Sequence, residues 1–149
     1  MIFDTHCHLN SEELYSRLDE VLENAKKVGV NKFLVIGWNK ESSLLAVELA
    51  HQYEGIYAAI GFHPTDIDGV SDEDYNQVMS LVDDPKVVAI GEIGLDYHWV
   101  KDPEQRNKQK EWFIKQIDFA NQHKKPAIHQ CCPLFCSHIN RPLYQRATL

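Results

Sequence analysis

The sequence predicts an α/β protein in which helices cover a sheet of parallel strands, and three observations support this fold class. Short, continuously apolar segments of strand length alternate with longer amphipathic segments of helical period. The apolar segments recur about every thirty residues, which is the length of a strand-helix-strand unit. The second, third and fourth of them end in glycine, at Gly37, Gly61 and Gly91. We therefore expect strand-helix units with right-handed crossovers.

The first predicted strand lies within residues 1–8, where a short apolar run ends in two histidines. Asn10 and Glu13 have the spacing of a helix N-cap and its capping-box partner, and Gly29 ends the helical period that follows. Residues 32–37 form the second predicted strand, residues 39–53 the second helix and residues 56–61 the third strand.

The second half of the pattern repeats the first. Ser71 is the predicted N-cap of a third helix, because acidic residues fill the first turn after it. Residues 86–91 form the fourth predicted strand, Asp102 and Pro103 open a long helix that extends to about His123, and residues 126–129 form the fifth strand. These spacings fit either a doubly wound sheet or the opening half of a barrel.

Composition narrows the class of protein. Fifteen basic and twenty-two acidic side chains give a net charge of −7, which argues against nucleic-acid binding through a broad basic surface. We expect a cytoplasmic protein without membrane contact, because no leader segment or membrane-length apolar run is present. The four cysteines show no disulfide framework, and no Gly-rich dinucleotide fingerprint follows the first strand.

Five residues capable of metal chemistry follow the predicted strands. His6 and His8 end the first strand on one face, and His63, Glu92 and His129 come at the ends of the third, fourth and fifth. Each alone is also explained by a structural role, such as a turn before proline for His63 or a satisfied strand-end histidine for His129. In a parallel barrel, however, the carboxyl ends of all strands share one face, where the active site forms. Together they favour a metal site.

The donor types predict hydrolysis assisted by two divalent ions. Imidazole nitrogen and carboxylate oxygen suit zinc and comparable ions, and a carboxylate has two oxygens with which to bridge two of them. A reasonable arrangement has one ion on His6 and His8, a second on His129, and Glu92 between them. Two ions about 3.5–4 Å apart generate hydroxide from bound water and stabilise a phosphoryl displacement.

Several segments together resemble the TatD-type deoxyribonucleases, a family of amidohydrolase-like metal-dependent hydrolases. The segments occur in the order of the family and span residues 1 to 130; they are FDTHCHL (3–9), GFHP (61–64), GEIGLDY (91–97), the QR pair (105–106) and PAIH (126–129). The resemblance implies a (β/α)8 barrel and divalent-metal-dependent hydrolysis of DNA, with the metal being Zn, Mg or Mn. His6, His8, Glu92 and His129 match metal-ligand positions, with Glu92 also catalytic. His63 matches a substrate-side position, and Asp96 and Tyr97 lie in the adjoining loop.

The sequence departs from the family after Gln130. The family continues with a further histidine ligand and, near the eighth strand, a metal-binding aspartate, and neither can be assigned here. A barrel of this kind usually needs about 250 residues. We therefore expect residues 1–130 to form the five-strand portion of an incomplete barrel, with open edges, weak stability, weak metal binding and little nuclease activity.

Residues 131–149 are interpreted as a non-family tail, frameshifted or disordered. They contain three cysteines and two prolines but no acidic residue. A frameshift predicts that another frame of the encoding DNA resumes family-like strands six to eight. The competing interpretation is a small zinc site, which would use Cys131, Cys132, Cys136 and His138. The spacings of these residues lack the usual Cys-x2-Cys knuckle.

Three functions follow from these patterns. The first is cleavage of DNA phosphodiester bonds by metal-activated water. The second is hydrolysis of a small ester, lactone or amide by a related barrel enzyme, because the same water activation serves several bonds. The third is a nonenzymatic remnant, which would fold without taking up metal. The sequence does not indicate an oligomeric state.

Overall fold

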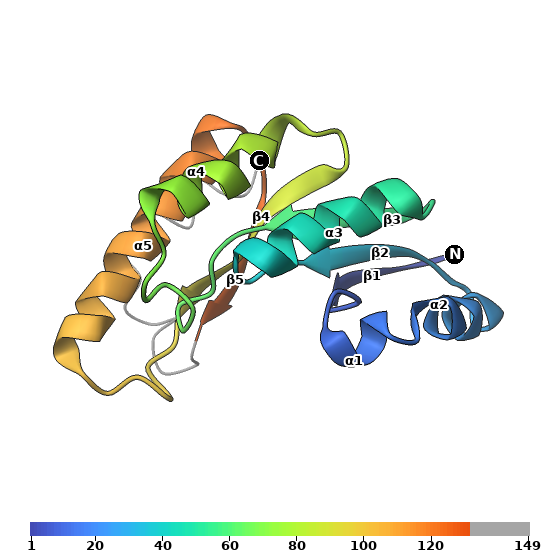
Figure 1. Ribbon diagram of the computed structural model, residues 1–149, viewed down its shortest axis with the longest axis horizontal. Helices are drawn as coiled ribbons and strands as arrows, with labels where there is room; N and C mark the ends of the chain where they lie inside the picture. The colour runs from blue at the N-terminus through green and yellow to red at the C-terminus, as the bar shows by residue number, and fades with distance from the viewer. Residues whose placement is uncertain (132–149) are drawn as a thin grey trace.

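The computed structural model describes residues 1–131, in which five parallel strands form one sheet in the order β1-β2-β3-β4-β5 (Figure 1). Consecutive strands are parallel neighbours throughout, so a crossover containing a helix joins each pair. The strands are β1 (Ile2–Cys7), β2 (Val30–Ile36), β3 (Ile56–Ile60), β4 (Val87–Leu95) and β5 (Ala127–Cys131). The helices are α1 (Glu12–Tyr15), α2 (Leu18–Lys27), α3 (Lys40–Gln52), α4 (Asp72–Met79), the short 3-10 helix η1 (Ser80–Asp83) and α5 (Pro103–Gln122). The expected five-strand portion of a barrel is confirmed.

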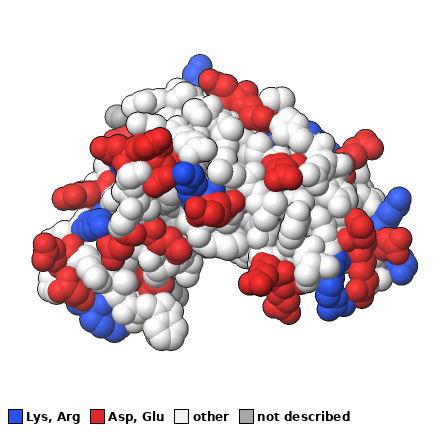
Figure 2. Space-filling view, viewed as in Figure 1, with Lys and Arg blue, Asp and Glu red and all other residues white. Residues whose placement is uncertain are grey.

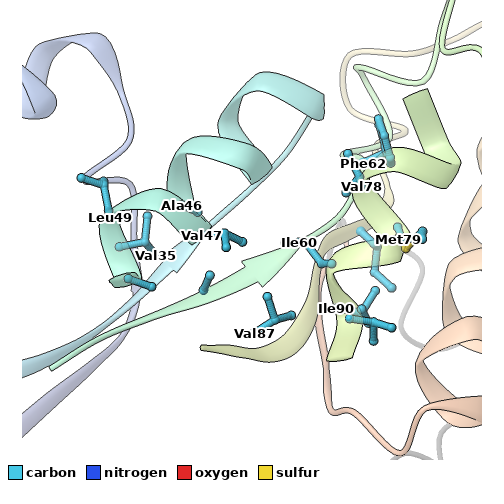
Figure 3. Packing of buried hydrophobic residues seen from close by; sticks show 14 of the residues in the cluster. Val35, Ala46, Val47, Leu49, Ile60, Phe62, Val78, Met79, Val87 and Ile90 are labelled. Carbon is cyan, nitrogen blue, oxygen red and sulfur yellow. The ribbon is translucent and has the colours of Figure 1, made fainter. Parts of the chain in front are cut away.

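The main hydrophobic core lies between the sheet and its helices (Figure 3). Alternate residues of β2 and β3, such as Val35 and Ile60, meet apolar residues of α3 and α4, such as Leu49 and Val78, and all four are fully buried. The opposite face of the sheet carries a smaller cluster formed by Leu34, Ile36, Ala59 and Ala89. Because side chains alternate along a strand, each strand directs one set of side chains toward the helices and the other set toward the inside of the curl.

Three helices begin where their capping residues predict. The side chains of Asn39, Ser71 and Asp102 each accept a hydrogen bond from a backbone N–H in the first turn of α3, α4 and α5. Asn39 forms a reciprocal capping box with Ser42, whose hydroxyl accepts from the Asn39 backbone N–H. The cap satisfies backbone donors that the helix itself cannot, so these boundaries can be read locally.

The prediction for the first helix is wrong in two respects. The segment forms two helices, α1 and α2, and the N-cap of α1 is Ser11 rather than Asn10. The Asn10 side chain is buried and donates hydrogen bonds to the carbonyl oxygens of Ile36 and Ser42, at 2.9 and 2.8 Å. It therefore ties the segment after β1 to the end of β2 and the start of α3, which is a long-range role that local spacing does not reveal.

β4 is longer than predicted, and it places Glu92 inside the strand rather than after it. The pairing of β4 with β5 shifts register between Ile90 and Ile93, and the pairing of β1 with β2 shifts between Asp4 and Cys7. Such irregularities re-aim the side chains that follow them. Each lies beside a predicted metal ligand, Glu92 in β4 and His6 in β1.

Among the charged side chains, acidic groups outnumber basic ones. Figure 2 shows acidic side chains spread widely over one face with fewer basic ones among them, in line with the net charge of −7. Within residues 1–131, no helix combines the length and apolar character needed to cross a membrane.

Candidate metal centre

His6, His8 and Glu92 form a compact group, in which one ligand atom of each residue lies within 4.8 Å of the others. The histidines come from the end of β1 and the glutamate from β4, which are the first and fourth strands of the sheet. In a flat sheet, three strand spacings would hold these strands about 14 Å apart. The curl of the sheet closes that distance and assembles the group.

The donor atoms are spaced as ligands of a shared ion are. The Nε2 atoms of His6 and His8 lie 3.9 and 4.0 Å from Oε2 of Glu92, which is too long for a hydrogen bond. Two atoms that each lie about 2.0–2.1 Å from one zinc ion are at most about 4.2 Å apart. The Glu92 side chain is 13 % exposed, whereas those of His6 and His8 are 44 % and 37 % exposed. The carboxylate therefore lies at the floor of the group and the imidazoles at its open side.

Cys7 lies between the two histidines in sequence but does not belong to the group. It packs against the main core, on the helix-covered face, and its thiol donates a hydrogen bond to the Leu34 carbonyl oxygen at 3.4 Å. Burial, together with the nearby Asp4 carboxylate, raises the pKa of the Cys7 thiol to about 12. One strand thus directs two imidazoles to one face and a neutral thiol to the other.

The surroundings of the His8 ring favour its uncharged form, which is the form that binds metals. Partial burial lowers the pKa of His8, and neighbouring His6 lowers it further, while Glu92 and the Ile36 carbonyl act in the opposite direction. The ring also meets His6 and Trp38 edge to face, with both centroid distances at 5.2 Å. The sequence analysis missed Trp38, although its position two residues after the end of β2 places it on the rim.

His63 lies in the turn after β3 and has a defined hydrogen-bonding arrangement. The backbone N–H of Thr65 donates to Nδ1 of His63 at 3.2 Å, while Nε2 lies 2.6 Å from Oε1 of Gln130. Nδ1 also lies 2.7 Å from Oγ1 of Thr65, so the assignment rests on Nε2: the Gln130 amide oxygen can only accept, and Nε2 therefore carries the proton that is donated to it. His63 therefore presents an N–H donor at the end of β3, next to the end of β5.

His129 lies in β5, opposite Ile93 of β4 in the sheet register, and its ring meets Phe113 of α5 at a centroid distance of 6.4 Å. It is not a member of the group whose ligand atoms all lie within 4.8 Å of one another. The structure thus brings three of the four predicted ligands together in one group and places the fourth on the adjoining strand. The cysteine-rich alternative site, at residues 131–149, has its side chains outside the described residues.

Two buried glutamines of α5 support the turn that carries His63, and the sequence analysis missed both. Gln116 accepts from the Phe62 N–H and donates to the Phe62 carbonyl, at 2.9 and 3.0 Å. Gln109 accepts from the Asp96 N–H and donates to the Pro64 carbonyl, at 2.9 and 3.1 Å. Their spacing of seven residues places both on one helix face. The sequence signal that could have identified them is a pair of polar residues seven positions apart, beside the apolar residues of α5.

Comparison with known proteins identifies the family. The model of the TatD related DNase family matches residues 3–131, so the chain belongs to this family. It is 44 % identical, over 86 % of its length, to the uncharacterized metal-dependent hydrolase YabD of Bacillus subtilis. It is 31 % identical, over 87 % of its length, to the 3'-5' ssDNA/RNA exonuclease TatD of Shigella flexneri.

Solved structures support the same assignment. The crystal structure of YjjV, a TatD homolog from Escherichia coli K12, superposes with a TM-score of 0.83 at 29 % identity, covering 97 % of this chain and 56 % of that one. A TatD family hydrolase from Entamoeba histolytica, at 23 % identity and a TM-score of 0.74, shares the fold. The chain spans about half the length of the curated relatives it matches, 49 % for both the Bacillus and the Shigella proteins.

Proposed function

We propose that His6, His8 and Glu92 hold a divalent metal ion, and that this chain carries part of a hydrolase that cleaves DNA phosphodiester bonds. The convergence of these three side chains from two strands that are not neighbours carries the proposal. Two imidazole nitrogens and a carboxylate oxygen match the donors that zinc and related ions accept, and three protein ligands leave a position open for water or substrate.

The chemistry assigned to the metal is that of other metal-dependent hydrolases. A bound divalent ion lowers the pKa of its water to about 7 and polarises a phosphoryl oxygen. Glu92 supplies the negative charge that balances the ion, from the least exposed position of the group. Glu92 and His129, which lie on neighbouring strands, would together hold a second ion.

His63 is proposed to bind the substrate. Its Nε2–H, now donated to Gln130, is a suitable donor for a phosphate oxygen at the rim of the sheet. The clamped turn from Phe62 to Pro64 fixes the position of this donor before substrate arrives. DNA as the substrate is supported by the family and by the name of the Shigella relative, which refers to single-stranded DNA and RNA.

Metal titration by calorimetry tests the proposal, using Zn²⁺, Mn²⁺ and Mg²⁺ with the wild-type chain and variants. We expect His8→Ala and Glu92→Gln each to weaken binding at least about tenfold, because even loss of a residue that merely supports a ligand costs that much. Cys7→Ala is the matched control, since it changes the residue between the histidines but leaves the donor set intact. Equal affinity of His8→Ala and wild type would contradict the proposed site.

Substrate class is tested on the same proteins with a labelled single-stranded oligonucleotide and a panel of small esters and lactones, each with and without chelator. We expect the wild-type chain to cleave the oligonucleotide slowly and in a chelator-sensitive way. Cleavage by His8→Ala should be slower than cleavage by the wild type. Chelator-sensitive cleavage confined to the small esters would instead support the second hydrolase function.

A further inference from the structure

The loop after β4 exposes a tryptophan to solvent. Trp99 is 76 % exposed, more than any other aromatic side chain in residues 1–131, and its ring meets the His98 ring edge to face at 4.6 Å. Large aromatic side chains usually bury most of their surface. An aromatic side chain presented in this way is a candidate for contact with a ligand.

The loop holds Trp99 outward through specific contacts on both sides. The buried Asp96 carboxylate accepts hydrogen bonds from the backbone N–H groups of His98 and Trp99, both at 3.0 Å. Beyond Trp99, the Arg106 guanidinium donates to the carbonyl oxygens of Val100 and Tyr97, at 2.8 and 3.2 Å, and lies 4.7 Å from the Tyr97 ring centroid. The exposure of Trp99 is therefore built into the loop conformation.

This loop adjoins the turn that carries His63. Gln109 hydrogen-bonds to the Asp96 N–H on one side and to the Pro64 carbonyl on the other, and Pro64 directly follows His63. A small cavity of about 150 Å³ separates the two loops, with Thr65 and Val100 among its lining residues. The loop also continues directly from β4, the strand that carries Glu92. Trp99 thus lies in a loop that leads from the strand carrying Glu92 and packs beside the turn that follows His63.

We propose that Trp99 is a stacking platform for a nucleobase of single-stranded nucleic acid, which holds the strand while a phosphodiester lies at the metal centre. This inference rests on the proposed function. Stacking on an aromatic ring is available to every base, because every base has a π-face. The loop has mixed charge, with Lys101 followed by Asp102 and Glu104, so attraction for phosphate is not what it offers. A protein partner is the competing occupant.

The test is binding of a phosphorothioate oligothymidylate, which resists hydrolysis, in the presence of Mg²⁺. Affinity and tryptophan fluorescence are measured for wild type, Trp99→Ala, Trp99→Phe and the control Ile114→Ala, which removes an exposed apolar side chain from α5. We expect Trp99→Ala to weaken binding about tenfold, Trp99→Phe to retain most of it and Ile114→Ala to match wild type. An abasic oligomer of the same length should bind all four proteins equally.

The outcomes separate this inference from the proposed function. Equal oligothymidylate binding by wild type and Trp99→Ala, or no binding by wild type, overturns the stacking platform whatever the hydrolysis assay gives. Stacking without chelator-sensitive hydrolysis supports the platform and overturns the proposed function. A change in self-association on Trp99→Ala, with oligothymidylate binding unaltered, shows that a protein contact occupies Trp99 and also overturns the platform.

Discussion

At the carboxyl end of β1, three consecutive residues serve two different purposes. His6 and His8 contribute to the candidate metal centre, while Cys7 packs against the core between sheet and helices. The alternation of side chains in a strand makes this separation automatic once the strand is placed. The sequence therefore predicted that His6 and His8 share a face. It could not reveal the partners of Asn10 or Gln109, because those contacts join residues more than ten positions apart along the chain.

The pair formed by His51 and Asp84 offers a pH-dependent measurement at the residue scale. Partial burial would raise the pKa of Asp84, but hydrogen bonds from the His51 ring and the Lys86 N–H, both at 2.8 Å, together outweigh it, so the pKa lies below its ordinary value. A lowered carboxyl pKa stabilises the fold above the unfolded pKa of about 3.9, and that stability disappears as pH falls through the folded pKa.

We therefore expect Asp84→Asn to lower the free energy of unfolding by about 0.5–1 kcal/mol at pH 7, and by less near pH 3. Urea unfolding at the two pH values measures the difference. Asp83→Asn is the control, because the Asp83 carboxylate is 90 % exposed and 3.8 Å from the His123 ring; its effect should stay within about 0.5 kcal/mol. A cost of Asp84→Asn that grows on acidification would be inconsistent with the lowered pKa.

At the scale of elements, the starts of α3, α4 and α5 were readable from the sequence, whereas the start of α1 and the strand irregularities were not. Asn39, Ser71 and Asp102 cap helices through contacts within three residues, so local spacing suffices. The register shift of β4 depends instead on how β5 lies beside it. For that reason the strand was expected to end at Gly91, whereas it continues to Leu95 and includes Glu92.

Gly94 allows β5 to approach β4 closely. Its φ of 145° is unfavourable for other residues, and a Cβ atom at this position would clash with the Gln130 carbonyl. We expect Gly94→Ala to reduce the free energy of unfolding by about 3 kcal/mol or more, as overpacking adds to backbone strain. Chemical unfolding measures it.

Gly69→Ala is the matched control for that substitution. Gly69 also has a positive φ, at 78°, but no atom lies within 4 Å of a Cβ placed there. Its cost should be about 1 kcal/mol, from the backbone alone. Equal losses for the two variants would show that the approach of β5 does not depend on Gly94.

At the scale of the whole molecule, the curl of the sheet brings the ends of distant strands together, so that their side chains form one site. The repeated strand-helix pattern predicted parallel strands whose carboxyl ends share a face, and His6, His8 and Glu92 do meet there. Their mutual distances could not be predicted, because curvature depends on twist and packing summed over all strands. His129, which was predicted to hold a second ion beside Glu92, lies on the adjoining strand β5, and its role as a ligand stays a prediction.

Net charge leads to a prediction about salt. With a charge of −7, we expect little of the affinity for DNA to come from lysine or arginine contacts with phosphates. Each phosphate neutralised on a single strand contributes about −0.7 to the slope of log K against log salt. Fluorescence anisotropy between 50 and 200 mM KCl at fixed Mg²⁺ should give a slope shallower than about −2. A slope steeper than about −4 would indicate a basic surface that the described residues do not suggest.

The paired glutamines of α5 also constrain how this chain can vary. Gln109 and Gln116 reach consecutive parts of one turn because two helical turns separate them. Inserting one residue between them would rotate the second by about 100° and remove a buried donor and acceptor from the Phe62 backbone. Length changes can accumulate in the exposed stretch around Gly69, but the helix must keep its residue count between the two glutamines.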